Sequence, residues 1–189
     1  VFKQTIFVLA LITWLGLVSA FAVAQSERII SFHSEIVVNQ DSTLTVTETI
    51  HVYANGQKIK RGILLDFPTQ RTDDLGQSWH TPFTLISVSR DNHPEPYKIE
   101  RNSTRTRIYV GSADVFLEAG EYTYVVKYTS SNQLGFYENH DELYWNVTGT
   151  KWDLPIESAT ASVFLPGEFN EENLRLVAYT GQFGSTGQD

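Results

Sequence analysis

The chain has 189 residues, of which 22 are acidic and 14 basic, and a formal net charge of −8. A chain this acidic does not bind nucleic acid through a phosphate-tracking surface, so we expect no nucleic-acid partner. Cysteine is absent, which excludes disulfides, zinc–thiolate sites, iron–sulfur clusters and cysteine nucleophiles. The fold therefore depends on its core, and 41% hydrophobic and 13% aromatic residues are enough to form one.

The first 24 residues differ in character from the rest. Lys3 precedes an apolar run over residues 6–18, and Ala22-Val23-Ala24 follows it. This pattern is typical of a secretory signal peptide, with cleavage expected after Ala24. An uncleaved membrane anchor is the alternative, since residues 6–24 have about the length of a bilayer span. A buried core helix fits poorly because the run has no polar face. Both leading interpretations place the remainder outside the cytoplasm.

From residue 28 onward the hydrophobic pattern has a period of two, which predicts β-strands. The clearest strand is 43–53, in which Leu44, Val46, Ile50 and Val52 share one face. The predicted strands are 28–38, 43–53, 63–67, 83–89, 97–100, 106–110, 122–128, 142–147, 158–165 and 174–179. About ten short strands without an amphipathic helix predict an all-β domain, an antiparallel β-sandwich, over residues 25–180.

Two stretches are predicted to lack regular structure. Residues 69–81 are polar and are expected to form a loop between two strands. Residues 181–189 form a loop-like tail with no closing strand, and we expect the protein to continue beyond it.

Glu48 is the first candidate site residue, because its parity places it on the apolar face of the strand 43–53. A carboxylate on a core face is costly unless it is paired. Arg61 or Lys60, just beyond the Asn55-Gly56 turn, is the expected partner. If that pair is buried, Arg61→Ala should cost about 3–5 kcal/mol of stability. A catalytic carboxylate is the less favoured interpretation.

The second candidate is an acidic loop that contains His140, Asp141 and Glu142. Such side chains can coordinate a hard metal ion. The run lacks the ligand spacing and the turn glycine of a calcium loop, however, so a solvated turn is the favoured interpretation. We expect no metal and no other cofactor.

Aromatic residues near position 145 form the third candidate. Parity groups Trp145 with Leu143 and Val147, which predicts a core anchor. Tyr144 would then face outward and, with Tyr137 and Trp152, form an aromatic platform for a sugar or a peptide. We find no nucleophile elbow, phosphate-binding loop or zinc-binding histidine pair in the sequence, so no catalytic residue is assigned.

Several segments resemble a known family. They are Thr47–Ile50, Lys60–Ile63, Asp66–Pro68, Gly120–Tyr124, Gln133–Phe136, His140–Gly149, Trp152, Pro155-Ile156 and Tyr179–Gly181. In kind and order they are similar to the extracytoplasmic domain of the bacterial predicted membrane proteins of the DUF2207 family, the YciQ-like group. The resemblance implies a signal peptide, an external β-rich domain and then transmembrane helices. It implies no catalytic residue, because no activity is established for the family.

These observations give three functional hypotheses. The leading one is a non-catalytic extracytoplasmic domain of a bacterial envelope membrane protein that contacts another envelope protein or a cell-wall polymer. In the intact protein, segments outside the folded domain would attach it to the membrane. The second hypothesis is a carbohydrate-binding module that uses the aromatic platform. The third is a metal-dependent hydrolase built on the acidic loop.

Overall fold

The computed structural model describes residues 25–72, 76–149, 151–167 and 170–180. In this part of the chain it contains thirteen strands and one short 3₁₀ turn, Glu171–Asn173. The prediction of an all-β fold is therefore confirmed. The predicted signal peptide or anchor, residues 1–24, and the tail 181–189 lie outside the described residues.

The first layer is a six-stranded sheet with the order β13-β1-β2-β10-β6-β7. Its strands are β1 (Arg28–Val38), β2 (Leu44–Ala54), β6 (Phe83–Arg90), β7 (His93–Pro94), β10 (Gly120–Ser130) and β13 (Ala159–Phe164). Buried and partly exposed side chains alternate along the whole of β2, as the period of two predicted. One face of the sheet therefore forms the core, and the other is rich in threonine and faces solvent.

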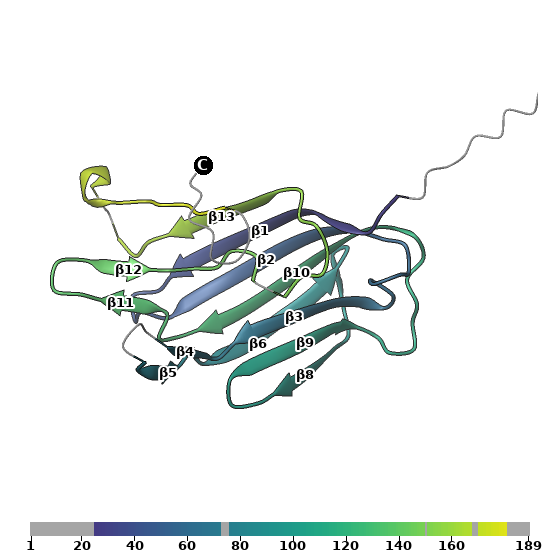
Figure 1. The fold of residues 1–189 in the computed structure, drawn as a ribbon, viewed down its shortest axis with the longest axis horizontal. Helices are drawn as coiled ribbons and strands as arrows, with labels where there is room; N and C mark the ends of the chain where they lie inside the picture. Colours follow the sequence, from purple (N-terminus) through teal and green to yellow (C-terminus); the bar gives the residue numbers. More distant parts are fainter. Residues whose placement is uncertain (1–24, 73–75, 150, 168–169, 181–189) are drawn as a thin grey trace, which may run out of the picture.

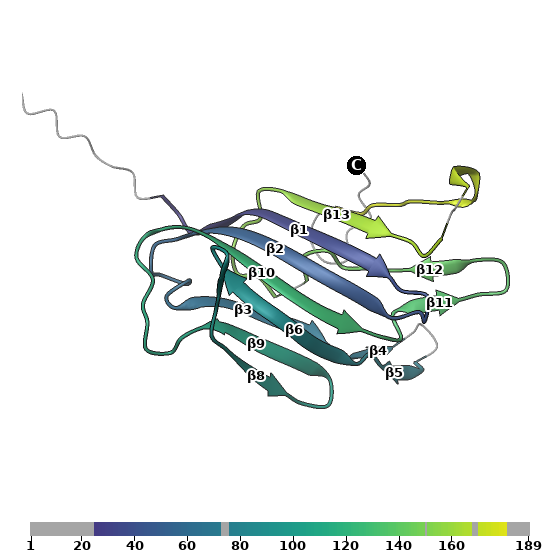
Figure 2. The same ribbon diagram turned by 180° about the vertical axis from the view of Figure 1, so that it is seen from behind.

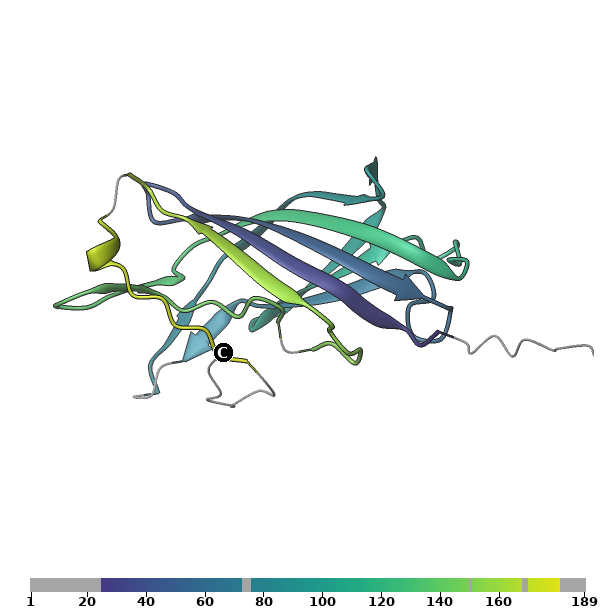
Figure 3. The same ribbon diagram turned by 90° about the horizontal axis from the view of Figure 1, so that it is seen from above.

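The second layer covers the core face in two parts (Figures 1 and 2). One part is a three-stranded sheet of order β3-β9-β8, formed by β3 (Gly62–Pro68), β9 (Arg105–Gly111) and β8 (Tyr97–Arg101). The other part is formed by residues 144–149 and 151–158, which are irregular and cross β1 and β2; we call them the crossing segment. In this segment, Trp152 contacts Phe32 edge to face at 6.3 Å between ring centroids, and Ile156 forms a β-bridge with Ile29. Figure 3 shows the layers from above.

Two small hairpins extend from one end of this sandwich (Figure 1). One joins β4 (Gln70–Thr72) to β5 (Ser78–His80), and the other joins β11 (Leu134–Phe136) to β12 (Asp141–Leu143). The expectation of a loop over 69–81 is therefore wrong. The hydrophobic pattern did not reveal the first hairpin, because a hairpin that is exposed on both faces has no alternation of apolar and polar residues.

Three further expectations are wrong in detail. The predicted strand 142–147 ends at Leu143, and residues 174–179 form no strand. In addition, β13 pairs with β1 in parallel rather than antiparallel fashion. Parallel strands need a long crossover, and the segment that leads to β13 supplies it by crossing the core face. Its apolar side chains are partly buried by this crossing and not by strand pairing, which is why the segment looked like a strand in the sequence.

Two glycines allow β3 and β9 to begin their pairing at very close range. Gly62 and Gly111 are cross-strand partners with φ angles of 143° and 122°. A Cβ on Gly62 would lie 1.8 Å from the carbonyl oxygen of Val110, and one on Gly111 would lie 2.0 Å from that of Arg61. Only glycine fits at either position.

A buried carboxylate fixes the start of the first strand. Glu27 is 7% exposed and accepts hydrogen bonds from the backbone N–H groups of Asn55, Gln57, Lys58 and Ile59. Burial raises the pKa of this carboxyl group, but the four backbone donors outweigh it, so the net pKa lies below the usual value. The β2–β3 loop is therefore folded around Glu27.

Candidate functional site

A pocket of about 120 Å³ opens where β3 meets the crossing segment. We call it the Glu48 pocket, because Glu48 on β2 lines it from the six-stranded sheet. The other lining residues used below are Asp66, Phe67, Arg71, Phe83, Tyr128, Gln133, Trp145, Asn146, Lys151 and Trp152. The site thus lies at the seam between the two parts of the second layer.

Glu48 and Tyr128 meet because of the strand register. Glu48 pairs with Val126 on β10, and Tyr128 lies two residues further along the same face, at the diagonal position. The Tyr128 hydroxyl donates a hydrogen bond of 2.6 Å to Oε1 of Glu48. Both side chains belong to the core face, with exposures of 9% and 1%.

Burial dominates the electrostatics of Glu48. It raises the pKa of the carboxyl group to about 7, against a smaller lowering by the Tyr128 hydrogen bond. The pKa of Tyr128 also lies well above its usual value, because of burial and the neighbouring Glu48. Near neutral pH, Glu48 therefore exchanges between a neutral acid and a carboxylate without a fixed cation to stabilise the charge.

Aromatic rings form one wall of the pocket. The Phe67 centroid lies 4.7 Å from that of Phe83, 5.1 Å from that of Tyr128 and 6.2 Å from that of Trp145. Trp152 lines the same space, and its indole N–H donates to the carbonyl oxygen of Thr148. The wall is apolar and its side chains are held by mutual packing.

Two buried polar atoms around the pocket have no hydrogen-bond partner. They are Oε1 of Gln133 and Nε1 of Trp145. Gln133 is 4% exposed. Its Nε2 group donates to Ser130, so its side-chain oxygen, Oε1, is the atom without a partner. Buried polar atoms normally find partners. An acceptor and a donor without partners beside one pocket indicate that something polar can occupy it.

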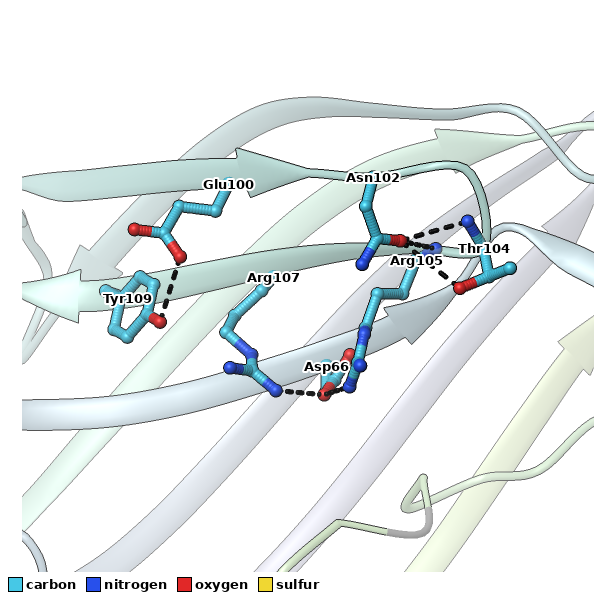
Figure 4. A network of polar contacts seen from close by, with 7 residues as sticks. All are labelled: Asp66, Glu100, Asn102, Thr104, Arg105, Arg107 and Tyr109. Atoms are coloured by element: carbon cyan, nitrogen blue, oxygen red, sulfur yellow. Dashed lines mark hydrogen bonds and ion pairs between the residues drawn. The ribbon is translucent and has the colours of Figure 1, made fainter.

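The charged side chains at the pocket are unequally paired. Asp66 accepts from Arg107 at 2.9 Å and from Arg105 at 3.3 Å (Figure 4). Two basic residues that line the pocket, Arg71 and Lys151, form no ion pair with a described residue. Arg71 donates to the backbone carbonyl of Tyr144, and Lys151 is exposed. The charged groups around the mouth are therefore net positive, although the chain as a whole is acidic.

The sequence placed Glu48 on the core face, where the structure has it, but its expected pairing with Arg61 is wrong. Arg61 is exposed, and its guanidinium lies over the ring of Phe116, 4.1 Å from the centroid. Lys60 hydrogen-bonds to Leu117 through its backbone. The basic residues follow the outward turn into β3, whereas Glu48 points into the core. Sequence proximity across a turn did not reveal this difference in direction.

The structure does not bring the acidic-loop candidates together as a metal site. Asp141 and Glu142 lie at successive positions of β12, opposite Phe136 and Gly135, so their side chains point to opposite faces. The His140 ring stacks on Tyr137 at 4.8 Å between centroids. Within the described residues, no group of three histidine or acidic side chains is arranged to hold a metal ion.

The proposed aromatic platform does not assemble either. Tyr137 lies in the β11–β12 hairpin, whereas Trp152 packs against Phe32 in the core. Tyr144 is 64% exposed, and its backbone carbonyl accepts a hydrogen bond from Arg71. Trp145 packs partly buried against the core, although not from a strand, and it contributes the unpartnered indole N–H.

A second, more open cleft of about 280 Å³ lies at the hairpin end of the sandwich. Its lining residues are Asp41, Ser42, Trp79, Ser131, Asn132, Leu134 and Phe136. Trp79 and Phe136 are 40% and 66% exposed. Sequence reasoning missed both aromatic residues, because Trp79 lay in a presumed loop and Phe136 had no periodic context.

The sequence could have indicated part of the Glu48 pocket. Tyr128 shares a face with Val126 in a clear alternating pattern, which predicts a tyrosine hydroxyl inside the core. By contrast, Gln133, Arg71 and Lys151 lie in turns or short hairpins, and no local signal marks them as neighbours of Glu48.

Comparison with known proteins assigns the family. The model of the predicted membrane protein (DUF2207) N-terminal domain matches residues 28–189. The uncharacterized protein YciQ of Escherichia coli (strain K12) is 29% identical over 160 residues, which cover 85% of this chain and 25% of that protein. The chain thus spans about a quarter of this relative's length. Within the described residues, no helix is long and apolar enough to cross a membrane.

Solved structures give only distant matches. Native yeast LTA4 hydrolase has a TM-score of 0.41 and 12% identity over 57% of this chain and 15% of its own. A putative protease from Parabacteroides distasonis has a TM-score of 0.36 and 8% identity over 56% of this chain and 23% of its own. Likeness at this level supports no conclusion about activity. The family match over most of the chain is decisive: this chain belongs to the DUF2207 family of predicted membrane proteins.

Proposed function

We propose that this domain is a non-catalytic binding module of its membrane protein and that the Glu48 pocket holds the ligand. The observation that carries the proposal is the set of polar groups at the pocket: a buried carboxyl group without a cation, an unpartnered amide oxygen and an unpartnered indole N–H. Apolar walls with a few convergent polar groups are typical of ligand sites. The other carboxylate that lines the pocket, Asp66, is paired with Arg105 and Arg107, and none of the described lining residues is a histidine, so the lining offers Glu48 no free partner for acid–base catalysis.

A fragment screen tests this proposal. The indole N–H of Trp145 gives an NMR signal that is assigned by comparison with Trp145→Phe. The screen includes acidic, neutral and basic fragments. We expect at least one of them to shift the Trp145 signal and to leave the Trp79 signal unchanged. If no fragment of any charge shifts the Trp145 signal, water alone satisfies these groups and the binding function is wrong.

We further propose that the domain works outside the cytoplasm. The supporting feature is the signal-like segment 1–24. A reporter enzyme that is active only outside the cytoplasm can be fused after residue 189. We expect activity with residues 1–189 and none with residues 25–189. Equal activity of the two fusions would contradict this location.

The open cleft supports glycan binding as a second candidate function. Exposed aromatic faces beside hydroxyl, amide and carboxyl groups suit a sugar ring. None of the described residues that line the cleft is basic, which disfavours anionic polymers. Titration with neutral wall polysaccharides should change tryptophan fluorescence in the wild type and in Trp152→Phe, but not in Trp79→Phe. If the fluorescence of Trp79→Phe changes as much as that of the wild type, the cleft is not the glycan-binding site.

A further inference from the structure

We infer that the Glu48 pocket takes the carboxylate end of a small N-acylated amino acid or peptide. This inference rests on the proposed binding function and names its ligand class. It is based on three features of the lining: the charge at the mouth, the two unpartnered polar atoms and the size of the enclosed space.

The charge at the mouth favours an anion. Arg71 and Lys151 line the pocket and form no ion pair with any described carboxylate. The charge of Asp66 is already shared by two arginines, Arg105 and Arg107. A carboxylate matches the planar guanidinium of Arg71 and the ammonium group of Lys151. A ligand cation would meet these two positive groups before it reached Glu48.

The unpartnered atoms match an amide group. An amide carbonyl accepts one hydrogen bond and an amide N–H donates one. The Trp145 indole N–H is a donor without an acceptor, and the Gln133 Oε1 atom is an acceptor without a donor. An amide adjacent to the carboxylate, as in an acylated amino acid or at a peptide C-terminus, carries one group of each kind that these two atoms lack.

The size of the pocket limits the ligand. Its volume of about 120 Å³ lies well below the roughly 300–1,000 Å³ of ordinary small-molecule sites. The pocket therefore holds one residue or one chain end. Phe67, Phe83 and Trp145 provide an apolar wall for a short acyl group or a small aliphatic side chain.

Glu48 makes this binding depend on pH. The charged and titratable groups that line the pocket with it are Tyr128 from β10, Asp66 from β3, Arg71 from β4 and Lys151 from the crossing segment. Below pH 7 Glu48 is mainly neutral, and above pH 7 it adds a negative charge beside the bound carboxylate. An anionic ligand should therefore bind more weakly as the pH rises, whereas a cationic ligand should bind more tightly.

Three probes of similar size test the inference on the full chain: N-acetylalanine, its neutral amide N-acetylalaninamide, and butylamine. The readout is the Trp145 indole N–H signal. We expect N-acetylalanine to bind about tenfold or more tightly than the amide at pH 6, and butylamine not to compete. Between pH 6 and pH 8 its affinity should fall about fivefold or more, a typical coupling between interacting sites. In Glu48→Gln this pH dependence should disappear while binding remains.

Lys151→Ala provides the charge test, because Lys151 is exposed and forms no ion pair with a described residue. It should remove most of the preference for the acid over the amide. Lys127→Ala is the matched control, since Lys127 is an exposed lysine on β10 that does not line the pocket. It should leave the preference unchanged.

The outcomes separate the inference from the proposed function. Equal binding of acid and amide, or butylamine binding that strengthens with pH, overturns the carboxylate inference and leaves a binding pocket of another specificity. The same holds if none of the three probes binds although other fragments in the screen do. If no fragment and no probe shifts the Trp145 signal, both the carboxylate inference and the proposed binding function are wrong.

Discussion

Glu27 and Glu48 are both almost completely removed from solvent, yet their surroundings differ in one respect. Four backbone N–H groups surround the carboxylate of Glu27, whereas Glu48 receives one hydroxyl, from Tyr128. The pKa of Glu27 is accordingly lowered and that of Glu48 is raised to about 7. Burial itself raises the pKa in both cases. The number of donors therefore decides whether a buried glutamate fixes a loop or remains available to a ligand.

The comparison implies opposite effects of pH on stability. Glu27 has a folded-state pKa below its unfolded value, so its contribution is present above about pH 4.5 and is lost as the pH falls through the folded pKa. Glu48 has a folded-state pKa above its unfolded value, so its contribution is present below about pH 4.5 and is lost as the pH rises through about 7. Asp66 resembles Glu27 in that several donors surround its carboxylate, in this case two arginines (Figure 4).

The largest expected effect comes from Glu27→Ala. This substitution removes the shared acceptor of the β2–β3 loop, and we expect a loss of about 3 kcal/mol in the free energy of unfolding at pH 7. Urea denaturation measures the change. Glu35→Ala, at an exposed position of β1, is the control and should change stability by less than about 0.5 kcal/mol. A loss below about 1 kcal/mol for Glu27→Ala would mean that water replaces the carboxylate.

The next effect concerns Glu48→Gln and has the opposite sign. The rise of the pKa from 4.5 to about 7 corresponds to about 3 kcal/mol of stability that the wild type loses by pH 8. The neutral glutamine should recover up to that amount at pH 8 and show little difference from the wild type near pH 4.5.

Unfolding curves measured across this pH range test the prediction, with Glu35→Gln as the control. A destabilisation by Glu48→Gln at pH 8 would show that the ionised carboxylate has an unrecognised partner. In that case the contrast between the two glutamates would not hold.

The smallest effect is expected from Arg61→Ala. An exposed guanidinium over an aromatic ring contributes about 0.5–1 kcal/mol, and Phe116 is 63% exposed. A loss of this size in thermal or urea unfolding agrees with the structure. The loss of about 3–5 kcal/mol expected for a buried pair with Glu48 would contradict the separation of these two residues.

Much of the fold could be predicted from local pattern. The alternation along β1, β2 and β10 predicted their extents within one or two residues and placed Glu48 toward the core. Strand periodicity is a local property, because each side chain's face follows from its neighbours in the chain. Prediction failed for the crossing segment, whose partial burial comes from packing on a sheet that is distant in sequence.

The sequence by itself determined that this is an all-β domain with a carboxylate on a core face. Only the tertiary structure decided what surrounds that carboxylate. Tyr128 reaches Glu48 through strand register, while Gln133, Trp145 and Lys151 reach the pocket through turns and an irregular segment. These contacts join residues about 80 to 100 positions apart, and no local pattern encodes such distances. The same physical reason explains why Arg61, close in sequence, is not the partner of Glu48.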